Sequence, residues 1–278
     1  MRIGLLTPEP GHPLLAAATA LLAREHEVEP VHPDAAPPDR VADVYLLKSR
    51  TPRALALARE LEARGAAVLN SASATELCQD RTAMAELAGR AGLPFAATRT
   101  FAALALLADA HDLTYPLVVK SRHSRRHDLV ARVDDRDGLR ALAGVWGPEP
   151  VVVQEFTANS GWDHKLWVIG DRVFAALRRS ELAPGGRGPT RSLPLDELPP
   201  GWADLALRVG EAYALEVYGV DLIDAAGSPL IVDVNAFPGI RGQLGAPEAL
   251  AELAVAAGSG RLIPRPRARP AQEWCSTP

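Results

Sequence analysis

The chain has 278 residues, of which 47% are hydrophobic and 23% charged, and its formal net charge is −4. This length suggests two or three modules with a buried core, and the ordinary apolar content with a small net charge excludes disorder for most of the chain. Acidic residues (34) outnumber basic ones (30), and no apolar run approaches the roughly 20 residues that span a bilayer, so we expect neither nucleic acid nor a membrane as a partner.

Strands and helices alternate over the first 95 residues. Apolar runs predict strands at 3–6, 27–29, 43–48 and 67–70 and helices at 14–24 and 51–64. Thr51 caps the second helix and Pro52 occupies its first turn. A further helix, capped by Ser73 or Thr75, is expected to run to Arg90. The alternation predicts a parallel α/β domain over residues 1–95, and ligands usually bind at the C-terminal ends of such strands.

Two further modules follow, over residues 96–155 and 156–258. In the first we expect strands at 115–120, 129–133 and 151–156 and a helix at 137–143. In the second we expect a hairpin of strands 165–169 and 172–179 around Gly170-Asp171, a helix at 202–215, and strands at 218–223 and 229–234. Residues 183–201, rich in proline and glycine, predict a mobile loop, and 259–278 a solvated tail.

Lysine is scarce. Of 30 basic residues only Lys48, Lys120 and Lys165 are lysine. A compact ammonium is not replaced by the flat fork of arginine, so these three are candidates for required chemistry. For any one of them, chance survival is the open alternative. The two cysteines, Cys78 and Cys275, form no disulfide framework or metal cluster, and with no signal peptide visible we expect a cytoplasmic protein.

Acidic residues interrupt two apolar strands near the end of the third module. Asp221 lies in the first, and Asp233 and Asn235 leave the same face of the second because they are two residues apart. Two carboxylates and an amide oxygen suit Mg²⁺, which completes its shell with phosphate oxygens and water. A hydrogen-bonded polar pair at a sheet end is the alternative. The turn that ends at Gly239 brings glycine amides close to a ligand.

Cationic residues gather after the strand that ends in Lys120. Residues 121–127 contain three arginines and two histidines, with no acid and no glycine. This density favours an anionic ligand over a solvated loop, and Lys120 itself can reach phosphates from the strand end. Gln154-Glu155-Phe156 joins the second and third modules, where a nucleotide base commonly lies against the hinge backbone.

In this order the features resemble the ATP-grasp fold, over about residues 2–245. The resemblance implies an α/β protein: a substrate-side domain (1–95) followed by two α+β subdomains (96–155 and 156–258) that clasp ATP between them. It implies that Lys120 contacts the ATP phosphates and that the backbone at 154–156 contacts adenine. It also implies Mg²⁺, with two ions during turnover, held by Asp221, Asp233 and Asn235.

Two branches of this superfamily are similar to the chain. RimK-type glutamate ligases match at 68–70, 154–156 and 239–242, but their glycine-rich loop is absent after Lys120. The inositol 1,3,4-trisphosphate 5/6-kinase branch resembles the chain more closely at Lys48, at Asp80-Arg81, at Lys165 eleven residues after Gln154, at 178–180 and at 233–239. A cation expected soon after the first strand is missing from residues 7–12, which weakens the case for a heavily phosphorylated substrate.

The kinase resemblance implies a role for each candidate residue. The ATP-binding set is Arg81, Lys120, Gln154, Glu155, Phe156, Lys165 and Ser180. The substrate-binding set is Lys48, His127, Lys165, Arg178, Asn235 and Gly239. The catalytic set is Lys120, Lys165, Asp233 and Asn235.

Three functions are therefore open. The first is a Mg²⁺/ATP-dependent kinase acting on a hydroxyl of a small anionic polyol such as an inositol phosphate. The second is a carboxylate–amine ligase that works through an acylphosphate. The third is an idle nucleotide-binding protein, against which the intact metal ligands and lysines argue. In the first two cases we expect a small anionic substrate and a monomer or small homo-oligomer.

Overall fold

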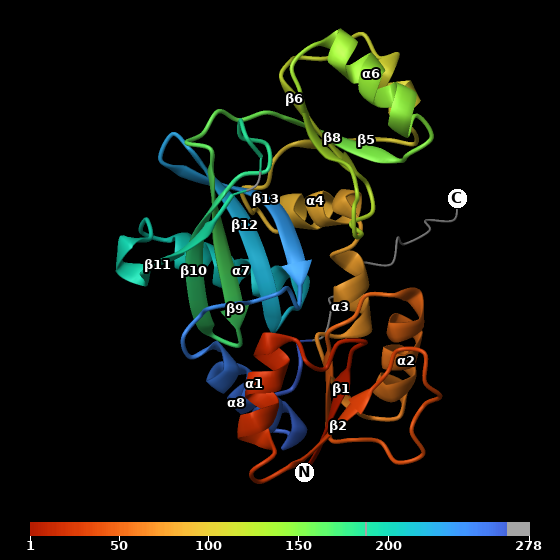
Figure 1. The fold of residues 1–278 in the computed structure, drawn as a ribbon, viewed down its shortest axis with the longest axis vertical. Helices are drawn as coiled ribbons and strands as arrows, with labels where there is room; N and C mark the ends of the chain where they lie inside the picture. Colours follow the sequence, from red (N-terminus) through yellow and green to blue (C-terminus); the bar gives the residue numbers. More distant parts are fainter. Residues whose placement is uncertain (187, 266–278) are drawn as a thin grey trace, which may run out of the picture.

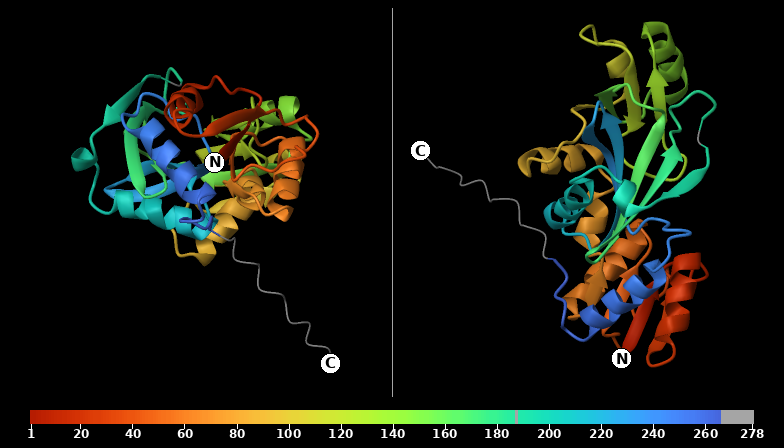
Figure 2. Two further views of the ribbon diagram at one scale, coloured as in Figure 1. Left: turned by 90° about the horizontal axis from the view of Figure 1, so that it is seen from below. Right: turned by 90° about the vertical axis from the view of Figure 1, so that its left-hand side faces the viewer.

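The structure, a computed structural model, describes residues 1–186 and 188–265. Its three β-sheets follow one another along the long axis of the molecule, with the N-terminal sheet at one end and the sheet of residues 98–155 at the other (Figure 1). The five-stranded sheet lies between these two, as the right-hand view of Figure 2 also shows.

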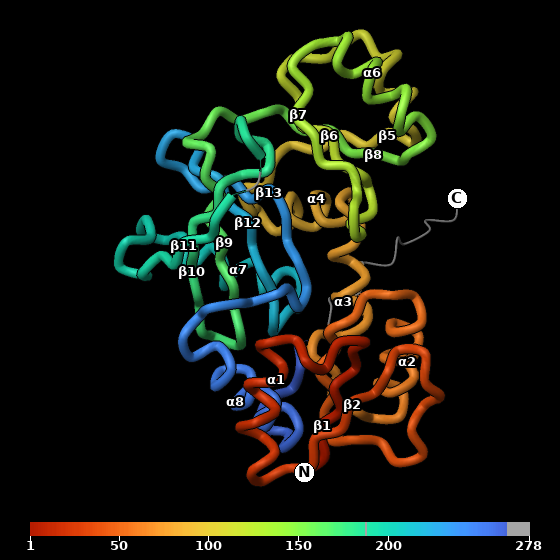
Figure 3. The backbone as a smooth tube through the Cα atoms, viewed as in Figure 1, coloured from red at the N-terminus to blue at the C-terminus, as the bar shows by residue number. Residues whose placement is uncertain are grey.

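The N-terminal sheet is parallel, with strand order β2-β1-β3-β4. Its strands are β1 (Arg2–Leu6), β2 (Glu27–Val31), β3 (Val44–Leu47) and β4 (Ala67–Leu69). Alternate residues of β1 face opposite sides: Ile3 and Leu5 pack with α1 (Pro13–Leu22) and α8 (Ala246–Gly258), whereas Leu6 packs with α2 (Pro52–Ala63). The helix α8 thus covers a sheet more than 170 residues before it in the chain, and Figure 3 shows it beside α1.

The sheet at the far end is antiparallel, with order β5-β8-β6-β7. It contains β5 (Thr98–Phe101), β6 (Leu117–Ser121), β7 (Val130–Val133) and β8 (Val151–Glu155). The helices α5 (Leu104–Ala108) and α6 (Arg136–Trp146) close one face, where Leu107 and Leu139 are fully buried against Val119 and Val153. The other face is left to border the pocket described below.

The middle sheet is antiparallel, with order β11-β10-β9-β12-β13. Its strands are β9 (Trp162–Ile169), β10 (Arg172–Arg179), β11 (Thr190–Leu193), β12 (Val217–Ala225) and β13 (Ser228–Ala236). The helices α4 (Arg81–Arg90) and α7 (Trp202–Tyr213) cover one face through Leu166, Val220 and Val234. The residues in between, Lys165 and Asp221 among them, leave the opposite face.

The predicted fold class is confirmed, and most of the expected strands and helices are present with ends shifted by one to three residues. The cap at Thr51 is as expected, since its side chain accepts a hydrogen bond from Ala54 N. The single helix expected up to Arg90 is wrong: α3 (Ala72–Leu77), capped by Ser71, ends before α4 begins. Asp80 starts the new helix because its Oδ1 accepts hydrogen bonds from Thr82 N and Ala83 N.

The prediction of a loop over residues 183–201 is wrong, because this segment contains β11 and the short 3₁₀ helix η1 (Leu195–Glu197). The strand β11 pairs with β10, and the Arg191 guanidinium lies 4.1 Å from the ring centroid of Trp162. Of the predicted solvated tail, residues 259–261 and Ile263 are exposed, whereas Arg265 is attached to the domain, since its Nη1 donates to Leu215 O at 2.9 Å. The remainder of the predicted tail, 266–278, lies outside the described residues.

Candidate active site

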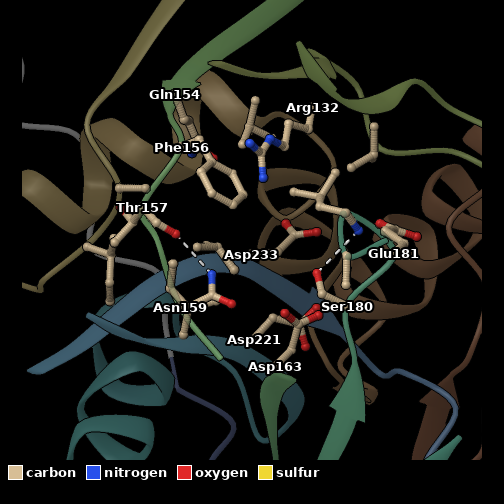
Figure 4. Close-up of a pocket in the computed structure, with 18 of the residues that line it drawn as sticks. Arg132, Gln154, Phe156, Thr157, Asn159, Asp163, Ser180, Glu181, Asp221 and Asp233 are labelled. Atoms are coloured by element: carbon tan, nitrogen blue, oxygen red, sulfur yellow. Dashed lines mark hydrogen bonds between the residues drawn. The ribbon is translucent and has the colours of Figure 1, made fainter. Parts of the chain in front are cut away.

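A pocket of about 430 Å³ lies between the middle sheet and the sheet of β5–β8. Its walls come from β6, β7, the chain after β8, and the open face of the middle sheet (Figure 4). Ten predicted site residues line it: Arg81, Lys120, Gln154, Glu155, Phe156, Lys165, Arg178, Ser180, Asp221 and Asp233. Four others do not: Lys48, His127, Asn235 and Gly239.

Lys120 connects the two walls of the pocket. It lies on β6, but its Nζ donates a 2.8 Å hydrogen bond to Val232 O on β13. Burial lowers the pKa of Lys120 to about 8, with Arg81 and Lys165 adding to this effect while Asp233 and Asp221 oppose it. A buried ammonium that interacts with the charges of Asp233 and Asp221 can bind the phosphates of a nucleotide.

The carboxylates gather around Lys165. Asp221 pairs with Lys165 across β12 and β9, and with Asp233 across β12 and β13. Lys165 Nζ lies 2.6 Å from Asp221 Oδ2 and 3.4 Å from Asp163 Oδ2. The Lys165 side chain is only 5% exposed, so the ion pair is screened from water. The structure therefore brings together acids and lysines that the sequence places in separate strands.

These residues fit a Mg²⁺ ion. Asp221 and Asp233 are cross-strand partners, and Lys165 already neutralises Asp221 as a cation. Within residues 1–186 and 188–265, no group of three or more His, Cys, Asp or Glu is arranged as a metal site. Mg²⁺ uses one or two carboxylates and completes its shell with phosphate oxygens, so Asp221 and Asp233 suffice as its acidic ligands. Asn235 lies two positions after Asp233 on β13 and therefore shares its face of the strand, from which it would supply the amide oxygen.

The hinge after β8 borders the pocket, but several of its polar groups are already paired. Gln154 Nε2 donates to Thr98 Oγ1 at 2.9 Å, and Phe156 N donates to Pro116 O at 3.1 Å. The Phe156 ring instead carries the Arg132 guanidinium 4.1 Å from its centroid, a cation–π contact. A nucleotide base that binds here would contact the Phe156 ring and the Arg132 guanidinium stacked on it.

Arg81 and Arg178 contribute further cationic groups. Arg81 Nη1 donates to Asp128 Oδ2 and to Ser121 O, both at 2.7 Å, and Nη2 lies 3.5 Å from Asp233 Oδ2. Burial disfavours the charged guanidinium of Arg81, but the neighbouring Asp233 and Asp128 outweigh this effect and raise its pKa. The Nε atoms of both arginines are buried without a hydrogen-bond partner among the described residues. Such donors suit an anion.

The cationic segment after Lys120, residues 122–129, is held by ion pairs. Arg122 Nη2 lies 2.7 Å from Asp80 Oδ2, and Arg125 pairs with Glu149 at 2.6 Å. His127 is exposed in a left-handed backbone conformation (φ 60°) and accepts a 3.2 Å hydrogen bond from Arg126 Nε. Its predicted contact with substrate phosphate stays a prediction.

A second group of predicted residues meets at the turn after β13. Lys48 directly follows β3, and its Nζ donates to Phe237 O and Pro238 O, both at 3.1 Å. Burial lowers the pKa of Lys48 to about 8, Arg241 and Arg50 lower it further, and Glu9 opposes them. Lys48 and Gly239 therefore lie close together, where the carboxyl ends of the parallel strands meet the end of β13.

Several pocket residues escaped the sequence analysis. Asp163 could have been found, because it lies two positions before Lys165 and must share its face of β9. Arg132 lies two positions after Val130, which also lines the pocket. Thr157, Asn159 and Glu181 come from loops, for which no periodic pattern exists (Figure 4).

The three-sheet arrangement and the pocket define an ATP-grasp fold. Residues 97–246 match the family described as "RimK-like ATP-grasp domain". The chain belongs to this family, and the resemblance proposed from the sequence is confirmed at that level. A crystal structure of a RimK domain ATP-grasp protein from Sphaerobacter thermophilus superposes with a TM-score of 0.74 at 24% identity, covering 91% of this chain and 99% of that one.

The curated relatives are named for ligation. A "Probable alpha-L-glutamate ligase" of Rhodopirellula baltica is 38% identical over 99 residues, which is 33% of this chain and 24% of that protein. A "Probable alpha-L-glutamate ligase 2" of Shewanella baltica is 29% identical over 204 residues, 69% of this chain and 66% of that protein. The chain thus spans between a quarter and two thirds of the length of these relatives. Their names favour the ligase alternative over the kinase that the sequence analysis placed first.

No helix in residues 1–186 and 188–265 is long and apolar enough to cross a membrane. The expected cytoplasmic location and the oligomeric state stay predictions.

Proposed function

We propose that this chain is an ATP-dependent carboxylate–amine ligase that works through an acylphosphate, with Mg²⁺ as its metal. One structural observation carries the proposal: a single pocket holds Lys120 and Lys165 together with Asp221 and Asp233. Membership of a family whose relatives here are named glutamate ligases supports ligation over phosphorylation of a hydroxyl.

The residues that line the pocket bind ATP and its metal ion in the first half-reaction, the formation of the acylphosphate. The purine base lies beside Phe156 and Arg132, and the phosphates extend towards Lys120 and Lys165. Asp221, Asp233 and Asn235 would hold Mg²⁺, which would offset the negative charge of the phosphates. A substrate carboxylate oxygen then attacks the γ-phosphorus, and the bond to the β-phosphate oxygen breaks to release ADP. Catalysis of this kind consists mainly of positioning and charge stabilisation.

The substrate side is the turn that holds Lys48. The ammonium of Lys48 and the guanidinium of Arg241 lie near this turn, with Glu9 as the opposing charge. This location is the carboxyl edge of a parallel sheet, where ligands commonly bind. We propose that these cations bind an anionic group of the substrate, and that Arg178 binds phosphate or substrate from the pocket side.

The proposal is tested by incubating the protein with Mg-ATP, a panel of carboxylates and L-glutamate, and reading products by mass spectrometry. Ligation predicts a condensation product, ADP and free phosphate, and hydroxylamine in place of the amine traps a hydroxamate. A product heavier by one phosphoryl group without free phosphate identifies a kinase and overturns the proposal. The Asp233→Asn variant is the matched control, and it should form neither product.

A further inference from the structure

His12 has an unusual environment for a residue outside the ATP pocket. It lies between β1 and α1 and is only 4% exposed. Its Nδ1 is buried without a hydrogen-bond partner among the described residues. Its Nε2 points at the turn after β13, 3.5 Å from the position that a Cβ on Gly239 would take. An imidazole so placed is directed at the proposed substrate side.

Among the described residues, no hydrogen bond of the His12 side chain explains its burial. It occupies the N-cap position of α1, yet its side chain caps no backbone N–H. A serine, threonine or aspartate at this position would normally do so. Leaving a polar ring atom buried and unpaired costs about 1–3 kcal/mol.

Burial and the neighbouring cations favour the neutral form of the ring. Burial lowers the pKa of His12 below its usual value, the nearby charges of Lys48 and Arg241 lower it further, and Glu9 opposes them. The same cations disfavour the ammonium form of an amine bound beside them, because like charges repel at short range. The site therefore favours a free amine facing a neutral imidazole.

We infer that His12 is the base that accepts the proton of the attacking amine in the second half-reaction. The inference rests on the proposed function. The amine nitrogen bonds to the acyl carbon, the bond from that carbon to the phosphate oxygen breaks, and phosphate leaves with the electron pair. The proton lost by nitrogen moves to His12 Nε2, while Nδ1 carries the hydrogen of the neutral ring, and solvent later takes the proton.

The test compares two nucleophiles in the His12→Gln variant. Hydroxylamine is largely unprotonated at neutral pH and needs no base, so ATP-dependent hydroxamate formation should match that of the wild type. Amide formation with an equimolar mixture of the twenty L-amino acids should fall by roughly 10²-fold at pH 7, the usual contribution of a general base. Raising the pH should recover part of it, because more amine is then free.

The matched control is His32→Gln. His32 follows β2 at the same edge of the same sheet, but it is exposed. This variant should retain both activities. Equal loss of hydroxamate and amide in His12→Gln would indicate a structural role and overturn the inference, and so would unchanged amide formation. Absence of hydroxamate from the wild-type protein would instead overturn the proposed function, and the inference with it.

Discussion

Lys165 and Asp221 face each other across β9 and β12, with the lysine Nζ 2.6 Å from the aspartate Oδ2. Asp221 is also a candidate ligand for Mg²⁺. A metal ion bound to Asp221 would therefore compete with Lys165 for this carboxylate. Displaced by the metal, Lys165 would be free to contact phosphate.

This competition predicts the effect of Lys165→Met. Removing the lysine charge should tighten binding of Mn²⁺ in the absence of ATP by roughly tenfold, which corresponds to about 1.4 kcal/mol. Turnover should fall at the same time. Electron paramagnetic resonance of free Mn²⁺ measures the affinity. Lys48→Met removes a lysine outside the pocket and should leave Mn²⁺ affinity unchanged; weaker binding in Lys165→Met would contradict the competition.

The lowered pKa of Lys120, about 8, predicts how ATP binding depends on pH. Above this value the free protein loses the ammonium, whereas the phosphates of bound ATP favour it and raise the pKa again. ATP binding should therefore take up a proton near pH 8–9 and weaken as the pH rises further. Calorimetry in two buffers of different ionisation enthalpy measures this uptake.

The control for that experiment is Lys120→Arg, which keeps the positive charge at every pH used. Its ATP affinity should show no proton uptake in this range. Uptake of the same size in the variant would assign the titration to another group.

The Arg81–Asp128 ion pair predicts a stability effect. The two side chains are 7% and 15% exposed, and Arg81 Nη1 lies 2.7 Å from Asp128 Oδ2. Asp128→Asn should lower the free energy of unfolding by about 1–3 kcal/mol, because the buried guanidinium loses a charged partner. Urea denaturation measures the change.

The matched control is Asp134→Asn. Asp134 also pairs with an arginine at 2.7 Å, but the side chains of Arg132 and Asp134 are 36% and 65% exposed. An exposed pair contributes less than about 1 kcal/mol. Equal losses in the two variants would show that burial does not govern the effect.

The hydrogen bonds of Asn70 join the N-terminal sheet to the middle sheet, and they predict a stability effect. It is 1% exposed, its Oδ1 accepts hydrogen bonds from Glu216 N and Val217 N, and its Nδ2 donates to Val217 O. At about 1 kcal/mol for each bond, Asn70→Ala should lower the free energy of unfolding by about 3 kcal/mol. Asn159→Ala, which loses only local loop bonds, should cost less. A smaller loss for Asn70→Ala than for Asn159→Ala would show that this junction carries little stability.

Local patterns in the sequence predicted much of the fold. Apolar runs located the strands, Thr51 and Pro52 located a helix start, and a spacing of two placed Asp233 and Asn235 on one face. Such features depend on neighbours within a few residues, so the sequence alone reveals them. The scarcity of lysine likewise pointed to Lys120 and Lys165, both of which line the pocket.

Only the tertiary structure decided which distant groups meet. Lys120 reaches the carbonyl of Val232, 112 residues away. The helix α8 covers a sheet formed at the other end of the chain, and His12 faces the turn at Gly239. These contacts depend on how sheets and helices pack and on which polar groups lose water in doing so. No local periodicity in the sequence reveals this packing or this loss of water. The sequence therefore predicted many residues of the pocket, but not the environment of His12.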